Sequence, residues 1–372
     1  MYQVIITNRE AGQRFDKYLH RILPNAGSGF LYKMLRKKNI TLNDRKADGS
    51  EKVTEGDCVK IFFAQETLDK FMGRHPDGAS DSVCAPKQGS DPDGIAGRME
   101  EAASYVQEFR RAYRQFTDIT VIYEDDHILI ADKPAGILSQ KAVKADLSLN
   151  EWLIGYLLEK GELSEADLTF YKPSVCNRLD RNTSGMVLCA KTLKGAQLLG
   201  RLLKDRTLHK YYQLYVKGII VEEQSIEGYL HKDVKKNKVT IKPVSSSTDL
   251  GCVPRLEDEK QNDPGNIEDA FIQTRYTPLR QETDKTLLEV ELITGKPHQI
   301  RAHLASIGHP LLGDYKYGDR AWNEKYRQQF GVRSQLLHAY KVVFPPLDAP
   351  FADLGGRTFY CELPEIFGRV AN

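Results

Sequence analysis

Short runs of apolar, β-branched and aromatic residues, separated by polar segments, recur from residue 119 to the C-terminal region. In chain order these runs predict strands: ITVIYED, HILIADKP, MVLCAK, KYYQLYVKG, KVTIKPV, FIQTRYTPLR, KTLLEVELI and HAYKVVF. Helical spacing is found at about 149–159, 192–204 and 297–307. Because several strands follow one another without a helix between them, the pattern predicts an α+β fold with a mixed, largely antiparallel sheet rather than a doubly wound one.

A different pattern precedes this region: two short stretches with helical spacing, followed by the strand-like segments NITLND and CVKIFF. The first stretch, RFDKYLHRILP, places four apolar side chains on one face: Phe15, Tyr18, Leu19 and Ile22. The second, GFLYKMLRKKN, turns Leu31, Met34 and Leu35 inward and places three cations on another face: Lys33, Arg36 and Lys37. Such a stripe is either an ordinary solvated helix face or a binding surface for phosphate groups, and charge alone does not decide between them.

Gly, Pro, Ser and Asp dominate residues 73–97, a composition typical of a flexible linker. Helical spacing returns over 98–116, which predicts a helix packed on the domain that follows. A second segment poor in hydrophobic residues, 245–267, predicts a surface insertion. We therefore expect three parts: an N-terminal domain over 1–64, a linker and connecting helix over 65–117, and a larger domain over 118–372.

The composition of the 372 residues is that of a soluble globular protein, with 41% hydrophobic and 28% charged residues. No run approaches the roughly 18 apolar residues that a membrane helix needs, and the N-terminus lacks the pattern of a secretion signal. We expect a cytoplasmic protein, monomeric and without a membrane partner. The net charge is only +2, but residues 1–63 carry 12 lysines and arginines against seven acids, so the basic excess is local.

The six cysteines form no CxxC pair and show no zinc-ligand spacing, which favours free thiols. His298 and His303 lie five residues apart without the glutamate of a zinc hydrolase motif. We expect both histidines to be structural and the protein to hold no metal and no cofactor.

One carboxylate, Asp180, lies between Arg178 and Arg181 in the segment NRLDRNTSG. An isolated surface ion pair of this kind contributes only about 0 to 1 kcal/mol and predicts no chemistry by itself. Two further segments change the picture: HKYYQLYVKG, residues 209–218, and ITGKPHQIRAHLASIGHPLLGDYKYGD, residues 293–319.

Together, RLDxxTSG, KxYxxxVxG and TGxxHQIRxHLxxxGxPxxGDxxYG, in this order, resemble the RluA-type pseudouridine synthases, which isomerise uridine in structured RNA. The preceding VIYEDDHILIADKPAG resembles the opening strands of that family, and LLHAYKVVF resembles its closing strand. The resemblance covers residues 119–347 nearly continuously. It implies the pseudouridine synthase type of catalytic domain.

The resemblance implies three catalytic residues. Asp180 matches the family's aspartate nucleophile, which detaches uracil from its ribose, and a carboxylate can both attack and leave again. Arg301 matches the active-site arginine, and an arginine near a carboxylate favours its ionised form. Pro297, a common first helical residue, places Arg301 in the first turns of a helix. Tyr212 matches the tyrosine that stacks on the target base, although a core aromatic would fit the strand pattern as well.

The resemblance also implies residues that bind RNA. Arg178 and Arg181 would lie against phosphates, and Lys210 would help to position phosphate or substrate. Helices, basic stripe and hairpin near the N-terminus resemble the S4-like RNA-binding domain, which assigns Lys33, Arg36 and Lys37 to RNA. Reaching a paired uridine requires its extrusion from the helix. An S4-like domain combined with RLDRNTSG resembles the subgroup that acts on large-subunit (23S) ribosomal RNA.

The chain departs from the family at two places that border the expected site. Asn177 stands where many relatives have histidine, and Lys296 and Pro297 stand before HQIR. Three other functions remain open: a synthase acting on transfer RNA, a noncatalytic RNA-binding factor in ribosome assembly, and a phosphoaspartyl hydrolase. The last class places a second acid two residues after its nucleophile, where this chain has Asn182.

Overall fold

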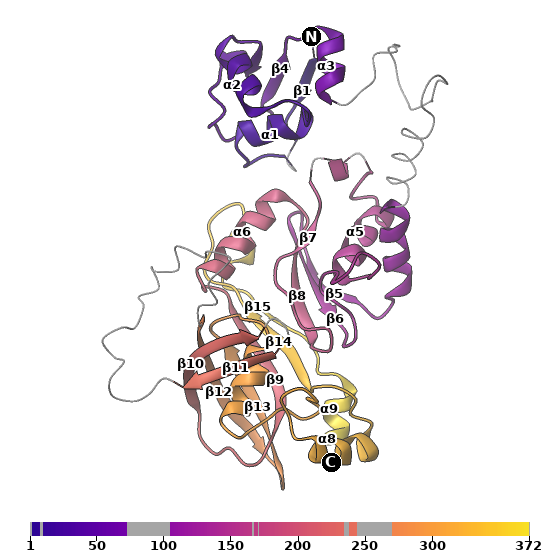
Figure 1. The fold of residues 1–372 in the computed structure, drawn as a ribbon, viewed down its shortest axis with the longest axis vertical. Helices are drawn as coiled ribbons and strands as arrows, with labels where there is room; N and C mark the ends of the chain where they lie inside the picture. Colours follow the sequence, from indigo (N-terminus) through magenta and orange to yellow (C-terminus); the bar gives the residue numbers. More distant parts are fainter. Residues whose placement is uncertain are drawn as a thin grey trace, which may run out of the picture.

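The computed structural model describes residues 2–7, 10–72, 105–165, 167–169, 171–233, 238–243 and 270–371. The predicted linker 73–97, the first turns of the predicted helix 98–116 and the predicted insertion 245–267 lie outside the described residues. Figure 1 shows two sheet-containing parts, a small one formed by the N-terminal residues and a large one formed by the rest.

The N-terminal unit, residues 2–72, combines a four-stranded antiparallel sheet with three helices. The sheet order is β1 (Tyr2–Ile5), β4 (Cys58–Ile61), β2 (Ile40–Leu42) and β3 (Arg45–Lys46), and the helices are α1 (Phe15–Ile22), α2 (Ser28–Arg36) and α3 (Gln65–Met72). The apolar faces predicted for the first two helices are buried in one core, as expected. Both predicted helices are therefore confirmed.

Helix α3 packs on this core rather than forming the start of a linker. Leu68 is buried among the N-terminal hydrophobic residues, and the backbone of Asn25 donates to the carbonyl oxygen of Phe71 at 3.2 Å. The N-terminal unit therefore extends to Met72, beyond the boundary expected at residue 64. The sequence pattern missed this because only three of the eight residues of α3 are large and apolar: Leu68, Phe71 and Met72.

The large part is built on an 11-stranded mixed sheet in which every predicted strand is present. Its main path runs β11-β10-β12-β13-β9-β14-β8-β6-β5, with β15 on β14 and β7 on β8. The bounds are β5 (Thr120–Glu124), β6 (Ile128–Lys133), β7 (Ser174–Val175), β8 (Ser184–Ala190), β9 (His209–Lys217), β10 (Gln224–Asp233), β11 (Lys238–Pro243), β12 (Ala270–Gln281), β13 (Lys285–Leu292), β14 (Leu337–Val343) and β15 (Thr358–Tyr360). Among the strands that the structure describes, only β8 and β14 pair in parallel, so the predicted α+β class with a largely antiparallel sheet is confirmed.

Helices cover the sheet on both faces (Figure 1). Their bounds are α5 (Leu149–Glu159), α6 (Leu193–Lys204), α7 (Gln299–Ser306), α8 (Arg320–Phe330) and α9 (Glu365–Val370), with 3₁₀ turns at Asp167–Thr169 and Ala352–Leu354. Residues 105–115 are also helical and pack on the large part, as predicted. Ser148 and Thr192 cap α5 and α6 with their side-chain oxygens.

Strand β8 reads as a continuous apolar run because both of its faces are covered. Val187 and Cys189 belong to the core under α5, whereas Met186 and Leu188 belong to the core under α6. Alternate side chains of one strand thus bury into two different layers. This double burial fixes the strand that leaves the Asp180 loop.

Strand β14 joins two halves of the sheet, because it lies between β9 and β8. Its parallel pairing with β8 brings Gly185 against Ala339. Gly185 has φ +105°, and a Cβ added there would lie 2.3 Å from the carbonyl oxygen of Ala339. Only glycine allows this approach and this backbone conformation.

In the part of the chain that the structure describes, no helix has the length and apolar character to cross a bilayer. The cysteines described there, Cys58, Cys176, Cys189 and Cys361, are free thiols, as predicted. No group of three potential metal ligands occurs among these same residues.

Candidate active site

Asp180 lies in the loop between β7 and β8, and the backbone on each side of it is fixed. Before it, the Ser139 hydroxyl accepts from the amide of Leu179 and donates to the carbonyl oxygen of the same residue, each at 3.0 Å. After it, the carbonyl oxygen of Arg181 accepts from the amide of Gly136 at 2.8 Å. The loop after β6 therefore holds the loop that carries Asp180.

Lys133, at the end of β6, strengthens this attachment from inside. Its fully buried ammonium group donates to three carbonyl oxygens, those of Pro134, Ile137 and Arg181, at 2.9, 2.9 and 3.1 Å. Burial lowers the pKa of Lys133 to about 7, while the negative charges of Asp180 and Asp132 act against the shift. Three acceptors match the three N–H groups of the ammonium form, so the geometry is that of a charged lysine.

Arg301, on α7, meets Asp180 from the other half of the sheet. Its Nη1 donates to Oδ2 of Asp180 at 2.8 Å, and its Nε and Nη2 donate to Asp314 at 2.7 and 3.0 Å. The side chain of Asp314 is wholly buried and that of Arg301 is 9% exposed, whereas that of Asp180 is 26% exposed. Of the two carboxylates that hold Arg301, only Asp180 is thus open to a ligand.

The two buried partners reinforce each other's charge. Burial acts to lower the pKa of Arg301, but the hydrogen bonds and charge of Asp314, followed by those of Asp180, raise it above its ordinary value. Burial acts to raise the pKa of Asp314, but the hydrogen bonds and charge of Arg301 hold it below its ordinary value. Both groups are therefore ionised at neutral pH.

Helix α7 begins at Gln299, not at Pro297 as the sequence predicts. His298 adopts a left-handed conformation with φ +57°, so the residues before it cannot continue the helix. The Gln299 side chain ties the start of the helix to β12, because it donates to the carbonyl oxygen of Gln273 and to the hydroxyl of Thr274, both at 3.0 Å. Arg301 still lies in the first turn, on a helix anchored to β12.

The two histidines predicted to be structural have different surroundings. His303 is buried on α7 with Nδ1 3.0 Å from the hydroxyl of Thr274, and burial lowers its pKa to about 4. His298 lies beside the site, with Nδ1 2.8 Å from the hydroxyl of Tyr317. The ring of Tyr317 in turn lies 5.3 Å from the guanidinium carbon of Arg301.

Tyr212, on β9, is 5% exposed and pairs with Val290 and Ala339 on the neighbouring strands. Burial and then the negative charge of Asp180 raise its pKa, so the phenol is neutral at physiological pH. Lys210, two residues earlier, is partly buried, and burial followed by the charge of Arg206 lowers its pKa.

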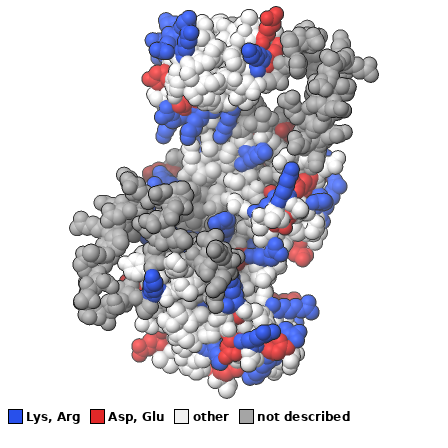
Figure 2. Space-filling view, viewed as in Figure 1, with Lys and Arg blue, Asp and Glu red and all other residues white. Residues whose placement is uncertain are grey.

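The other predicted RNA-binding residues lie on the surface. Arg178 and Arg181 are exposed on either side of Asp180. The three cations of the predicted stripe, Lys33, Arg36 and Lys37, are exposed at the C-terminal end of α2 in the N-terminal unit. Figure 2 shows Lys and Arg side chains at the surface of that unit near α2.

The sequence reasoning missed Asp314 and Lys133 as parts of the site. Both lie in segments that the motif comparison covers, GDYKYGD and ADKPAG, but neither has a role that its spacing reveals. The two positions at which the chain departs from the family, Asn177 and Lys296, form hydrogen bonds that hold the backbone around the site. The side chain of Asn177 accepts from the amide of Leu188 at 2.7 Å, and the amide of Lys296 donates to the side chain of Gln299 at 3.1 Å.

Known proteins similar to this chain are described as pseudouridine synthases. The model of the RNA pseudouridylate synthase family matches residues 127–306. Ribosomal large subunit pseudouridine synthase C of Rickettsia bellii is 30% identical over 341 residues, 91% of this chain and 92% of that protein. The protein of the same name from Vibrio cholerae is 26% identical over 334 residues, 90% and 85% of the two chains.

The fold agrees with these matches. The solved structure of human RNA pseudouridylate synthase domain containing 4 is 22% identical, has a TM-score of 0.53 and covers 71% of this chain and 95% of its own. The extent of the relationship to the Rickettsia protein, which reaches from the N-terminal unit through the large sheet, excludes a chance match of one motif. The chain belongs to the RluA-type RNA pseudouridylate synthases and is an isomerase that converts uridine to pseudouridine in RNA.

Proposed function

We propose that this enzyme isomerises uridine in large-subunit ribosomal RNA, with Asp180 as the nucleophile. The substrate follows from relatives named for that RNA, which align with nearly the whole chain. The observation that carries the catalytic assignment is the hydrogen bond between Arg301 and Asp180, which joins the two halves of the sheet at one partly exposed carboxylate.

Asp180 has the geometry of a nucleophile. Its Oδ2 accepts from Arg301, and no described residue donates a hydrogen bond to its Oδ1. That oxygen can therefore attack an extruded uridine without first losing a partner. Arg301 holds the carboxylate in place and neutralises part of its charge, and Asp314 fixes the position of the guanidinium.

Tyr212 supports binding rather than proton transfer. A neutral phenol whose pKa is raised is a poor base at physiological pH, because it is already protonated and releases its proton reluctantly. Its ring is almost wholly buried but lies close enough to Asp180 to feel that charge, so a pyrimidine held at Asp180 would stack on the part of the ring that stays exposed. We assign it to holding the target base.

We assign the grip on RNA to basic residues in both parts of the chain. Arg178, Arg181 and Lys210 would contact phosphates near the target, and the N-terminal unit would act as an S4-like RNA-binding domain through Lys33, Arg36 and Lys37. The exposure of the cations on α2 supports this assignment. Residues 118–372 would then form the catalytic domain, with the helix over residues 105–115 packed on it.

A tritium-release assay tests the proposal. Large-subunit ribosomal RNA labelled with tritium at uracil C5 should lose label to water in the presence of the enzyme, because C5 exchanges its hydrogen for a bond to the sugar, while the RNA chain stays intact. Asp180→Asn should abolish release, and Asp205→Asn, an exposed position after α6, should not.

Three outcomes would contradict the proposal in different ways. Release by Asp180→Asn at the wild-type rate would exclude the nucleophile. Release from transfer RNA but not from large-subunit RNA would change the substrate. No release from either RNA by the wild-type enzyme would leave a noncatalytic binding factor.

A further inference from the structure

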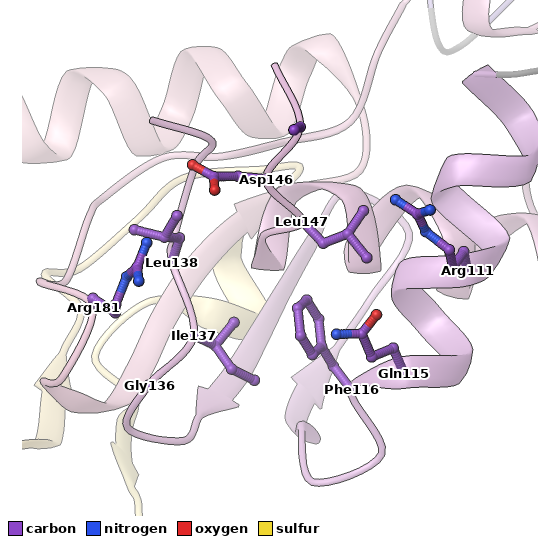
Figure 3. A pocket seen from close by; sticks show the side chains of 10 residues that line it. Arg111, Gln115, Phe116, Gly136, Ile137, Leu138, Asp146, Leu147 and Arg181 are labelled. Carbon is purple, nitrogen blue, oxygen red and sulfur yellow. The ribbon is translucent and has the colours of Figure 1, made fainter. Parts of the chain in front are cut away.

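A cavity of about 400 Å³ opens beside the loop that carries Asp180 (Figure 3). Three segments form its walls: the end of the 105–115 helix with Phe116, the loop after β6, and Arg181. The volume lies within the range of about 300 to 1,000 Å³ that small ligands occupy in proteins. None of the residues assigned to catalysis above lines it.

One wall of the cavity is apolar and fixed. Phe116, Ile137 and Leu147 line it and pack against the main hydrophobic core at the same time. Lys141, in the loop after β6, forms a 2.6 Å ion pair with Glu108 on the helix, so the two sides of the cavity are held together. A partly exposed aromatic ring on a fixed wall is a surface on which a base can stack.

The rim of the cavity is cationic. Arg111 and Arg181 both line it and both are exposed. Arg111 forms no ion pair with any residue that the structure describes. The amides of Val143 and Ala142 and then the charge of Arg181 lower the pKa of Asp146, so Arg181 lies near one carboxylate of the lining while its exposed guanidinium can still meet a phosphate. Asp146 is the carboxylate of the lining, and its Oδ2 accepts from the amides of Ala142 and Val143 at 3.0 and 2.9 Å.

The cavity is coupled to the catalytic loop through Arg181, the residue after Asp180. The carbonyl oxygen of Arg181 accepts from the amide of Gly136, which is itself part of the cavity wall. A ligand that contacts the side chain of Arg181 is therefore bound beside the loop that carries the proposed nucleophile. In an RNA substrate, the group beside this loop is a nucleotide close to the target in the RNA chain.

We propose that this cavity binds a second unpaired nucleotide of the RNA, adjacent to the target uridine, with its base on Phe116 and its phosphates at Arg111 and Arg181. The carboxylate of Asp146 repels phosphate and accepts hydrogen bonds, so the N–H edge of the base lies toward it. The inference rests on the proposed function and extends it: the enzyme selects uridines whose neighbour can also leave the helix.

The first test uses the intact enzyme and the tritium assay on large-subunit RNA. Arg111→Gln should raise KM for RNA about tenfold and leave kcat unchanged, because a phosphate contact is lost away from the reacting atoms. Arg114→Gln is the matched control: it removes the same charge from an exposed site on the same helix that does not line the cavity. Equal effects of the two changes would overturn the proposal.

The second test asks whether a base occupies the cavity. A short RNA containing the target is made with an abasic site at either neighbouring nucleotide, and each is assayed with wild type, Phe116→Leu and Phe116→Tyr. One of the two abasic RNAs should have a raised KM with wild type and with Phe116→Tyr, which keeps the ring. With Phe116→Leu, the KM of this abasic RNA should be no higher than the KM of the intact RNA, because the stacking contact is already absent.

Additive effects of the abasic site and Phe116→Leu at both neighbours would overturn the proposal, because two independent defects add. A wild-type enzyme that releases tritium but shows equal KM for the intact and both abasic RNAs would also overturn it and leave the proposed function standing. A wild-type enzyme that releases no tritium from any RNA would overturn both.

Discussion

Arg301 presents three nitrogen atoms to two carboxylates, and the two contacts differ in kind. Asp314 takes Nε and Nη2 in a bidentate arrangement inside the protein, whereas Asp180 takes Nη1 alone at the edge of solvent. Bidentate pairing fixes the plane of a guanidinium, and a single bond does not. Asp314 therefore sets where Arg301 lies, and Arg301 then sets where Asp180 lies.

Removal of the charge on Asp314 should affect both stability and turnover. Asp314→Asn leaves the buried guanidinium with one carboxylate in place of two, and breaking a buried pair of this kind costs about 3 kcal/mol. We expect the free energy of unfolding in urea to fall by about that amount, and kcat to fall with little change in KM, since Asp180 loses its fixed position.

Glu324→Gln provides the comparison, because its ion pair with Arg327 lies on the surface of α8. It should change neither quantity measurably. Unchanged kcat in a folded Asp314→Asn enzyme would show that Arg301 does not depend on its buried partner.

The role of an individual residue could be predicted from the sequence only where the residue belongs to a recognisable motif. Asp180 and Arg301 come from segments 121 residues apart, and the structure places them in contact. Asp314 was not predictable in the same way, because a carboxylate 13 residues after Arg301 has the same local pattern whether it faces solvent or a buried guanidinium. Its role depends on the turn that follows α7.

At the scale of elements, the parallel contact between β8 and β14 determines how the Asp180 loop leaves the sheet. The backbones of Gly185 and Ala339 approach so closely that no side chain fits between them. The strand can then carry its apolar residues into two cores at once. A sheet of this kind is intolerant of any change at the crossing point.

Two glycine substitutions with opposite expected signs test this constraint. Gly185→Ala should destabilise the protein strongly, since both the positive φ and the 2.3 Å approach to the Ala339 oxygen oppose a Cβ. Gly200→Ala, inside α6 with no atom near the added carbon, should raise the free energy of unfolding by about 0.5 to 1 kcal/mol. Urea denaturation of both variants measures the difference. A Gly185→Ala protein as stable as wild type would mean that the strands separate without cost.

Elements were predictable where one local pattern dominates. The main strands and α5 and α6 have such patterns, but the start of α7 depends on His298 in a left-handed conformation, which favours asparagine or glycine and is not readable from histidine. Helix α8 was missed although its signals are present. Asp319 caps it, Trp322 and Tyr326 are buried one turn apart, and Gly331 ends it.

At the scale of the whole molecule, the predicted RNA contacts divide between the two units. The net charge of +2 gives no sign of a polyanion partner, because basic and acidic residues are nearly equal in number. The local excess in the N-terminal unit and the cations around Asp180 would grip one RNA at two places. Affinity then depends on both units even though the chemistry occurs in one.

The salt dependence of RNA binding tests the role of the N-terminal unit. The triple change Lys33→Ala, Arg36→Ala, Lys37→Ala should reduce the slope of log K against log salt by about 2 to 3, since each lost phosphate contact removes about 0.7 to 0.9. A triple change of Arg320, Lys325 and Arg327 to alanine on α8 removes the same charge at another exposed surface and should leave the slope unchanged. Filter binding at several salt concentrations measures the slope for each variant. Equal slopes for the two triple variants would mean that the loss of charge, and not its position on α2, causes the effect.

The position of β14 in the sheet has a consequence for biosynthesis. The strand that unites the Asp180 half with the Tyr212 and Arg301 half follows both halves in the chain and is therefore synthesised after them. At roughly 5 to 20 residues per second, about 8 to 30 seconds pass between the synthesis of residue 180 and that of residue 337. During this interval the nascent chain has no assembled catalytic centre while it is held by the ribosome, the particle whose own RNA is its proposed substrate.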